Sequence, residues 1–402
     1  MELIPRATFE QIRRERVEEI VAARRQGAKV VGYFCIYAPV ELVQAAGAIP
    51  VRLMRGGQAA EEAGEKYLRA DACSFCNSCM GNFELDPVYK QVDAVVSVNT
   101  CDMMRRLPEA IEKHFGIPVY QLYMPRTSEP LPHRVAEFRR QLEWLAEELA
   151  TLTGSAIAAE RLESEIAAFN RLRGMLRQAS DTRRMNAPLL SGGTMLDLAA
   201  TAWLLGPVKA ISLIEEVLRI VAARPRREER RPRLMLGGSI LTEDDRWLLE
   251  MVEEKADIVT DILCTGTRWF AEDVPGEGER GNGEVGRREC DEGERGNGEG
   301  GRRERYWPNG GPLDRLARFY FSRPCMHRRP NSAMYEYAQR LAREFRVEGL
   351  VYKTLLYCDP WSFEVRRLQE ALGLPMLHLD TDYSTENREQ VRTRVEAFLE
   401  TL

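Results

Sequence analysis

The sequence predicts an α/β fold with two parallel-sheet lobes that are joined by a helical segment. In the first lobe, β-rich runs at 29–34 and 48–54 flank a helix that begins near Pro39, which is the strand–helix–strand signal of a parallel sheet. The same alternation resumes after Pro232, with strands expected at 234–236, 257–263, 349–357 and 375–379. We therefore expect two Rossmann-like (flavodoxin-like) lobes with a cofactor in the cleft between them.

The first lobe is predicted to span 1–128. A leading helix over 8–27 carries an apolar stripe at helical spacing, so it is expected to lie on the lobe surface. After the first two strands, an apolar run at 92–98 predicts a third strand and a helix reaches to about Phe115. A last strand follows at 116–122.

The connecting segment, 129–230, is predicted to be helical throughout. Apolar residues recur at helical spacing in four stretches, 135–152, 156–179, 195–205 and 211–223. Charged residues interrupt the longest apolar stretch, 196–223, so it predicts a buried or amphipathic helix pair and not a membrane span.

The second lobe, 231–402, is predicted to contain helices at 242–254, 331–345, 359–372 and 385–401 between its strands. An insertion at 275–311 interrupts it. This insertion contains a duplicated segment rich in Glu, Gly, Arg and Asn, a composition that cannot bury a core, so we expect it to be disordered. Cys290 lies within it, has no counterpart in the second copy and is not expected to be a ligand.

Composition narrows the class of protein. A chain of 402 residues with 44% apolar and 30% charged residues is typical of a globular protein with more than one core. The net charge of −5 gives no electrostatic case for nucleic acid or an anionic membrane surface. Because the N-terminus lacks an apolar signal core, we expect a cytoplasmic protein, where nine cysteines favour metal or redox chemistry over disulfides.

Cysteines dominate the candidate site. Cys73, Cys76 and Cys79 recur at intervals of three in a stretch expected to form turns, and Cys101 follows the predicted strand 92–98. Thiolates in such numbers suit an iron–sulfur cluster or zinc.

An internal duplication relates the two lobes. Cys101-Asp is followed by a helix and by Gly-Ile-Pro118, and Cys358-Asp is followed by a helix and by Gly-Leu-Pro375. Both cysteines should therefore end equivalent strands, at the sheet edge where open α/β folds bind ligands. Cys264 ends another strand, and Cys325 comes from the loop after the insertion, so seven thiols are expected to converge.

These residues resemble the 2-hydroxyacyl-CoA dehydratase and benzoyl-CoA reductase family, particularly its double-cubane branch. The resemblance covers most of the chain apart from the insertion. It rests on Gly32-Tyr-Phe-Cys-Ile-Tyr-Ala-Pro, Asp71-Ala-Cys-Ser-Phe, Asn99-Thr-Cys-Asp, Leu263-Cys-Thr-Gly-Thr, Pro324-Cys-Met-His-Arg-Arg-Pro, Tyr357-Cys-Asp-Pro-Trp and Leu379-Asp-Thr-Asp-Tyr-Ser.

The resemblance implies that Cys73, Cys101 and Cys358 bind a [4Fe–4S] cubane. In the double-cubane branch, Cys264 and Cys325 would hold a second cubane of an [8Fe–9S] cluster, with Cys79 or Cys76 as competing candidates for the sixth ligand.

The resemblance also implies how such a cluster is used. Low-potential electrons would come from an ATP-hydrolysing activator, a homodimer with its own [4Fe–4S] cluster, and this chain has no Gly-x-x-x-x-Gly-Lys-Ser/Thr run of its own. The chain would pair with a second copy or with a related subunit. Its substrate would be a small molecule or an acyl-CoA. Two reactions stay open: reduction at a double cubane, or dehydration of an (R)-2-hydroxyacyl-CoA through a ketyl radical at one [4Fe–4S] cluster.

The same cysteines and the Ser191–Thr194 stretch also have simpler interpretations. The thiols could instead hold zinc in a structural or interaction protein. Cys35, at a strand end, is expected to be a core thiol. The stretch Ser191–Thr194 could cradle a phosphate but more often forms a turn and a helix N-cap. The sequence identifies no general base or other catalytic residue.

Overall fold

The computed structural model describes residues 4–69, 71–223, 229–276 and 310–402. The predicted insertion at 275–311, including Cys290, lies almost wholly outside these residues.

Two parallel sheets of four strands each form the core of the described chain, in the orders β2-β1-β3-β4 and β6-β5-β7-β8. Every strand pair is parallel. The strands are β1 (Val30–Tyr33), β2 (Ile49–Arg52), β3 (Ala94–Val98), β4 (Val119–Leu122), β5 (Arg233–Gly238), β6 (Asp257–Asp261), β7 (Gly349–Leu355) and β8 (Met376–Thr381). The identical strand order confirms the predicted fold class and agrees with a duplication in which β3 corresponds to β7.

The central strands are buried on both faces. Every residue of β1, β3, β5 and β7 is buried, which explains their continuous apolar runs, whereas β4 and β8 at the edges are partly exposed. In both sheets the strand order reverses between the first and third strands, β1 and β3 or β5 and β7. Such a reversal opens a ligand site at the carboxyl ends of those strands.

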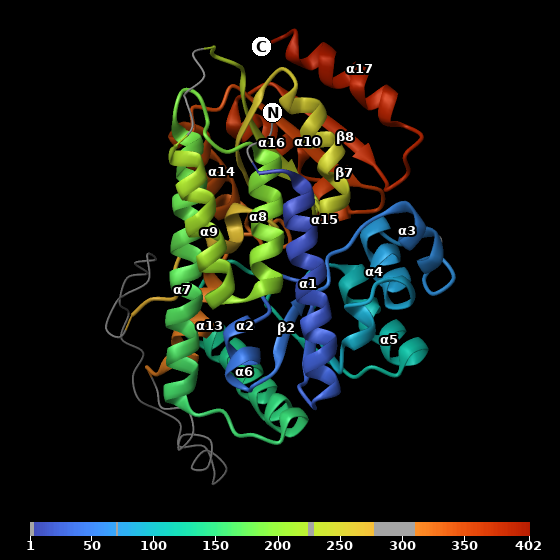
Figure 1. The fold of residues 1–402 in the computed structure, drawn as a ribbon, viewed down its shortest axis with the longest axis vertical. Coiled ribbons are helices and arrows are strands. Elements are labelled where there is room, and N and C mark those ends of the chain that lie inside the picture. Colours follow the sequence, from blue (N-terminus) through green and yellow to red (C-terminus); the bar gives the residue numbers. More distant parts are fainter. Residues whose placement is uncertain (1–3, 70, 224–228, 277–309) are drawn as a thin grey trace.

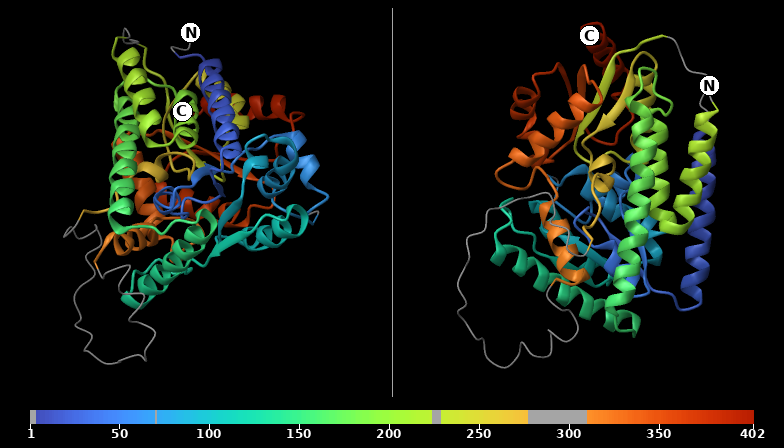
Figure 2. Two further views of the ribbon diagram at one scale, coloured as in Figure 1. Left: turned by 60° about the horizontal axis from the view of Figure 1, so that its bottom comes forward. Right: turned by 90° about the vertical axis from the view of Figure 1, so that its left-hand side faces the viewer.

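A layer of long helices runs past both sheets. It consists of α1 (Arg6–Arg25), α7 (Ala159–Asp181), α8 (Gly192–Leu205) and α9 (Pro207–Ala222), while α6 (Pro132–Thr153) packs against β4 of the first sheet. The four connecting helices predicted from the sequence are present. The views agree that the second sheet lies above the first along the longest axis, with α1, α7, α8 and α9 on one side (Figures 1 and 2). Helix α8 contacts both β2 and β6 and so bridges the two sheets.

The predicted boundaries after residues 128 and 230 fall in the loops between β4 and α6 and between α9 and β5. The division into three domains stays a prediction.

Shorter helices complete the first lobe: α2 (Val40–Ala45), α3 (Gln58–Gly64), α4 (Ser74–Leu85), η1 (Tyr89–Gln91) and α5 (Asp102–Phe115). The expectation of turns around the first three cysteines is wrong, because a helix begins directly after Cys73 and carries Cys76 and Cys79. Helix α5 ends at Gly116, whose left-handed φ of 66° suits glycine.

The helices of the C-terminal part of the chain are η3 (Glu243–Asp245), α10 (Arg246–Glu253), α11 (Thr267–Phe270), α13 (Pro312–Ser322), α14 (Ser332–Glu344), α15 (Asp359–Ser362), α16 (Val365–Leu372) and α17 (Arg388–Leu399). Of these, α13 packs on α6 and α7 beside the first sheet. The short helix η2 (Thr182–Arg184) follows α7. The helix predicted at 242–254 begins as a 3₁₀ turn with a capping box between Thr242 and Asp245. The single helix predicted at 359–372 is divided into α15 and α16.

The carboxyl edges of the two sheets face each other. The Gly56 amide, after β2, donates to Asp244 Oδ2 at 3.0 Å, and the Tyr383 amide, after β8, donates to Glu61 at 3.0 Å. Gly56 has no room for a side chain, because a Cβ atom there would overlap the Tyr383 ring. These contacts bring together the loops in which the cysteines lie.

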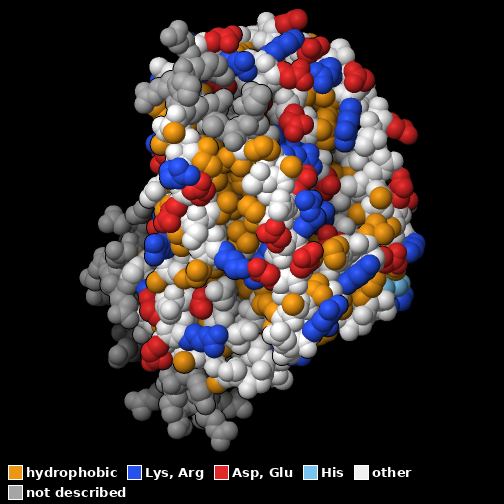
Figure 3. All heavy atoms as spheres, in the orientation of Figure 1, with side chains coloured by type: hydrophobic (Ala, Val, Ile, Leu, Met, Phe, Trp, Pro, Cys, Tyr) orange, Lys and Arg blue, Asp and Glu red, His pale blue; other side chains and the backbone are white. Residues whose placement is uncertain are grey.

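Charges on the face that α1, α7, α8 and α9 form are interspersed in sign (Figure 3). No helix within the described ranges combines the length and apolar character needed to cross a bilayer.

The backbones of helices α3 and α4 are in direct contact, and we predict that this contact positions α4, the helix that carries Cys76 and Cys79. A Cβ atom at Gly81 would overlap the carbonyl oxygen of Ala60. Gly81→Ala should therefore lower the free energy of unfolding by about 1–3 kcal/mol. Gly174→Ala, inside α7, meets only Arg177 Nη2 at 3.6 Å and should raise that free energy by roughly 0.5–1 kcal/mol. Thermal unfolding of both variants checks this, and a neutral Gly81→Ala would contradict it.

Candidate metal centre

Thiols from both lobes meet where the two carboxyl edges face each other. Cys73, at the start of α4, and Cys358, after β7, lie within hydrogen-bonding reach of one another. The Ser74 amide donates to the Leu356 carbonyl oxygen at 3.4 Å, which ties the backbone of the two segments together. The predicted convergence of these two cysteines is thus present in the structure.

Cys76 and Cys101 belong to the same group. Interaction with Cys73 lowers the pKa of the Cys76 thiol, but burial and the neighbouring Cys101, Cys79 and Cys358 raise it overall. Burial raises the pKa of Cys101 to about 12, against a backbone hydrogen bond that lowers it, and Cys358 adds to the rise. Protein surroundings alone therefore keep these thiols protonated at neutral pH, and a bound cation would have to displace the protons.

Three of these cysteines occupy helix N-caps: Cys73 on α4, Cys101 on α5 and Cys358 on α15. Cys101 Sγ accepts from the Met104 amide at 3.4 Å. Helix N-termini favour negative charge, so these positions suit thiolates. Asp102 and Asp359 follow the caps as the first helical residues.

Tyr357 turns the chain so that Cys358 can cap α15. Its φ of 63° lies in the left-handed region, which a tyrosine adopts only when the surroundings impose it.

A second group contains Cys264, Cys325 and the buried Arg268. Burial by itself would raise the pKa of Cys325, but Arg268 and then His327 reverse the effect and lower it to about 5. The surroundings of Cys325 therefore favour its thiolate at neutral pH. Two guanidinium nitrogens of Arg268 and both ring nitrogens of His327 are buried and have no hydrogen-bond partner among the described residues.

Asp261 orders the loop that carries Cys264. Its Oδ1 accepts from the amides of Leu263 at 3.1 Å and Thr267 at 2.8 Å. The loop leads into α11, which supplies Arg268. The end of β6 thus fixes both a thiol and its neighbouring cation.

Cys35 links the two groups. It follows β1, at the point where the order of the first sheet reverses, and is partly exposed. Burial, then Cys325, raise the pKa of its thiol to about 12, with a further contribution from Cys264, and Cys35 in turn raises that of Cys101. Cys35, which the sequence analysis expected to be a core thiol, thus lies near candidate ligands of both groups.

The Cys79 side chain points toward the Leu53 carbonyl oxygen. It is completely buried, and its Sγ approaches the Leu53 carbonyl oxygen at 3.9 Å. Burial raises the pKa of this thiol well above its usual value, while a contact with Tyr89 opposes the rise. Of the two competing candidates, Cys76 lies nearer the other thiols.

The donor set fits a thiolate-bound cluster. All eight cysteines in the described part of the chain are free of disulfides. Within that part, no three His, Cys, Asp or Glu side chains are arranged to hold a single metal ion. The thiols extend across both lobes, an arrangement that suits a polynuclear cluster with several thiolate ligands. The buried Arg268 guanidinium would supply positive charge beside it.

Comparison with models of protein families shows which family this chain belongs to. The model for the 2-hydroxyglutaryl-CoA dehydratase D-component matches residues 35–285 and 297–402, which is most of the sequence. The chain belongs to this family. The matched region includes every cysteine of both thiol groups.

Individual members of the dehydratase family match over almost their full length. The chain is 25% identical to the protein YjiM of Escherichia coli (strain K12), covering 98% of this chain and 97% of that protein. It is 23% identical to the (R)-phenyllactyl-CoA dehydratase beta subunit of Clostridium sporogenes, covering 94% and 92%. It is 21% identical to subunit beta of the (R)-2-hydroxyglutaryl-CoA dehydratase of Acidaminococcus fermentans, covering 94% of both chains.

The Ser191–Thr194 stretch forms a helix N-terminus in this dehydratase-family chain. Ser191 caps α8 by accepting from the Thr194 amide at 3.0 Å. Glu253 accepts from the amides of Gly192 and Gly193, the positions that a phosphate would need. Of the two interpretations offered for Ser191–Thr194, the helix N-cap is the one present, because Glu253 already bonds the amides that a phosphate would need.

Glu253 should make stability depend on pH. Burial raises its pKa from 4.5 to about 7, so between these values the folded state holds more protons than the unfolded state. Stability should therefore fall as pH rises from about 5 to about 7. Glu253→Gln removes this pH-dependent contribution to stability. The difference in unfolding temperature between the variant and the wild type should therefore become more positive as pH rises from about 5 to about 7. Glu250→Gln, at an exposed position on the same helix, is the control, and a pH-independent difference for Glu253→Gln would contradict the assignment.

Proposed function

We propose that this dehydratase-family chain is an oxygen-sensitive iron–sulfur reductase subunit that works in the cytoplasm. It would receive low-potential electrons from an ATP-hydrolysing activator and pass them one at a time to a small or acyl-CoA substrate. The observation that carries the proposal is the meeting of thiols from both lobes at the facing carboxyl edges. Cysteine thiolates are the ligands of iron–sulfur clusters, and an iron–sulfur cluster supplies reversible one-electron transfer at low potential.

Six cysteines in two groups of three are the proposed ligands. Cys73, Cys101 and Cys358 would bind one cubane, as the family resemblance implies. Cys264 and Cys325 would bind the second cubane of an [8Fe–9S] cluster. We assign the sixth position to Cys35, in place of Cys76 or Cys79, because Cys35 neighbours the second group and also Cys101.

The surrounding side chains would hold the thiolates and tune their charge. Backbone hydrogen bonds at the starts of α4, α5 and α15 would offset part of the cost of ionising Cys73, Cys101 and Cys358. Arg268 lies beside Cys325 and Cys264, and the buried His327 packs edge-on against Tyr37 with ring centroids 5.2 Å apart. Positive charge near a cluster raises its reduction potential, so Arg268 would favour the reduced state of the nearer cubane.

The same proposal implies which other proteins this chain would work with. The sequence contains no phosphate-binding lysine motif, so ATP hydrolysis would occur on a separate [4Fe–4S] activator homodimer. The names of two relatives describe beta subunits of dehydratases, which supports pairing with a related subunit, with a homodimer as the other possibility.

A second function, dehydration of an (R)-2-hydroxyacyl-CoA at a single [4Fe–4S] cluster, is favoured by those same names. It would use Cys73, Cys101 and Cys358 alone. It leaves the proximity of Cys35 to Cys264 and Cys325, and that of Arg268 to the latter two, without a role, and for that reason we place it second.

Serine variants should separate ligands from bystanders. Cys35→Ser, Cys264→Ser and Cys325→Ser should each lose most of the iron of the second group, because serine is a poor ligand for iron in these clusters. Cys79→Ser is the matched control and should keep wild-type iron, since its thiol faces Leu53. Iron per chain and visible absorbance after anaerobic purification are the measurements. Full iron in Cys35→Ser would remove that residue from the ligand set.

Iron stoichiometry should distinguish the two functions. Anaerobically purified protein should contain about eight irons per chain if both cubanes are present and about four if only one is. Equal amounts of acid-labile sulfide, or slightly more, should accompany the iron. Stoichiometric zinc without visible absorbance would contradict both functions and favour a structural metal site.

A further inference from the structure

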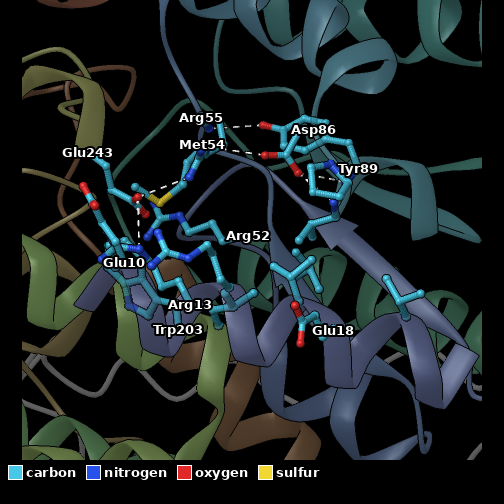
Figure 4. A pocket seen from close by; sticks show the side chains of 18 of the residues that line it. Glu10, Arg13, Glu18, Arg52, Met54, Arg55, Asp86, Tyr89, Trp203 and Glu243 are labelled. Carbon is cyan, nitrogen blue, oxygen red and sulfur yellow. Dashed lines mark hydrogen bonds and ion pairs between the residues drawn. The ribbon is translucent and has the colours of Figure 1, made fainter. Parts of the chain in front are cut away.

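A large cavity lies between α1, the end of β2 and α8, beside the loops in which the Gly56 amide donates to Asp244. Its volume is about 740 Å³, within the range of small-molecule sites. Its apolar wall consists of Val17, Val21, Val51, Met54 and Val88. Figure 4 shows Arg13, Arg52 and Trp203 among its lining side chains.

Arg52 is the feature that points to a ligand. Its side chain lines this cavity, the residue is only 7% exposed, and all three guanidinium nitrogens lack a hydrogen-bond partner within the described chain. A buried guanidinium without a partner is strongly unfavourable, because the charge has lost water and gained no acceptor. An acceptor that is not part of the described chain would relieve this.

Trp203 provides a second donor in the same wall. The Arg52 guanidinium stacks on its ring, 4.3 Å from the centroid, and the indole Nε1 is buried without a partner as well. The stack holds the guanidinium plane in one orientation. Each of these nitrogens is shielded from solvent in the structure, so an oxyanion entering the cavity would reach them through a small side-chain movement and would supply the acceptor that both donors lack.

The other charges of the cavity are largely satisfied. Arg13 pairs with Glu243 at 3.1 Å and donates to Thr201 at 2.9 Å, and Arg6 pairs with Glu10 at 2.8 Å. Asp86 pairs with Arg55 and Asp244 accepts from the Gly56 amide, so of the acidic lining residues only Glu18 has a carboxylate without an ion pair or hydrogen bond within the described residues. The combination of an unengaged cation and an apolar wall selects an amphipathic anion.

We propose that this cavity binds an organic oxyanion, a carboxylate or phosphate on an apolar body, with the anionic group on Arg52 and Trp203 Nε1 and the body against the valine-rich wall. The site goes beyond the proposed redox function and does not depend on it. Arg52 also lies near Cys35, whose thiol it influences weakly, so the test must distinguish a ligand contact from a role at the thiols.

Calorimetry on the full-length, anaerobically purified chain tests the proposal, with octanoate, octyl phosphate and octylamine as probes. At least one anion should bind, octylamine should not, and the preferred anion identifies the head group. Arg52→Gln should weaken binding by about tenfold to a hundredfold, since a charge-assisted hydrogen bond is lost. Trp203→Phe keeps the ring, loses the donor and should weaken binding several-fold. Arg388→Gln, from an Arg–Trp stack outside the cavity, should bind as wild type does.

Several results would overturn the proposal. These are failure of both anions to bind the wild-type chain, equal binding of octylamine, or unchanged binding by both Arg52→Gln and Trp203→Phe. Loss of iron in Arg52→Gln with unchanged anion binding would assign Arg52 to the thiol centre. If Arg52→Gln does not fold, Trp203→Phe decides, and its iron content shows whether the two sites are independent.

Discussion

The opposition of two carboxyl sheet edges is the constraint on which the rest of this structure depends. Each sheet alone offers a ligand site where its strand order reverses. Hydrogen bonds from Gly56 to Asp244 and from Tyr383 to Glu61 hold the two edges face to face, and α8 touches a strand of each sheet. Cysteines that are far apart in the sequence, such as Cys73 and Cys358, become neighbours only through this arrangement.

Charge explains why such a thiol centre needs an inorganic partner. At a pKa of about 12, ionising Cys101 at pH 7 costs about 7 kcal/mol, which the protein surroundings do not recover. Metal binding recovers it by replacing the protons. Cys325 differs, because Arg268 and His327 lower its pKa to about 5 against the effect of burial. The two groups of thiols thus present different electrostatic surroundings to whatever they bind.

The sequence was sufficient for the fold class and for the relation between Cys101 and Cys358, because strand patterns and landmark spacings are local. It was insufficient to show that Cys35 lies near Cys264 and Cys325, because these three residues meet only in space and a single cysteine at a strand end has the pattern of a core residue. Helix α4 was also missed, since its Ser, Asn and Cys residues are weak helix formers. Packing of Gly81 against the backbone of α3 supports that helix, and this contact is not visible in a local pattern.

The central claim is that thiols from both lobes share one inorganic cofactor. A crystal structure of anaerobically purified protein, with anomalous data collected at the iron absorption edge, tests it most directly. The account predicts strong iron peaks between the lobes, bound by Cys73 and Cys358 together and by Cys35 with Cys264 and Cys325. Iron bound by thiols of one lobe only, or no iron at the facing edges, would contradict it.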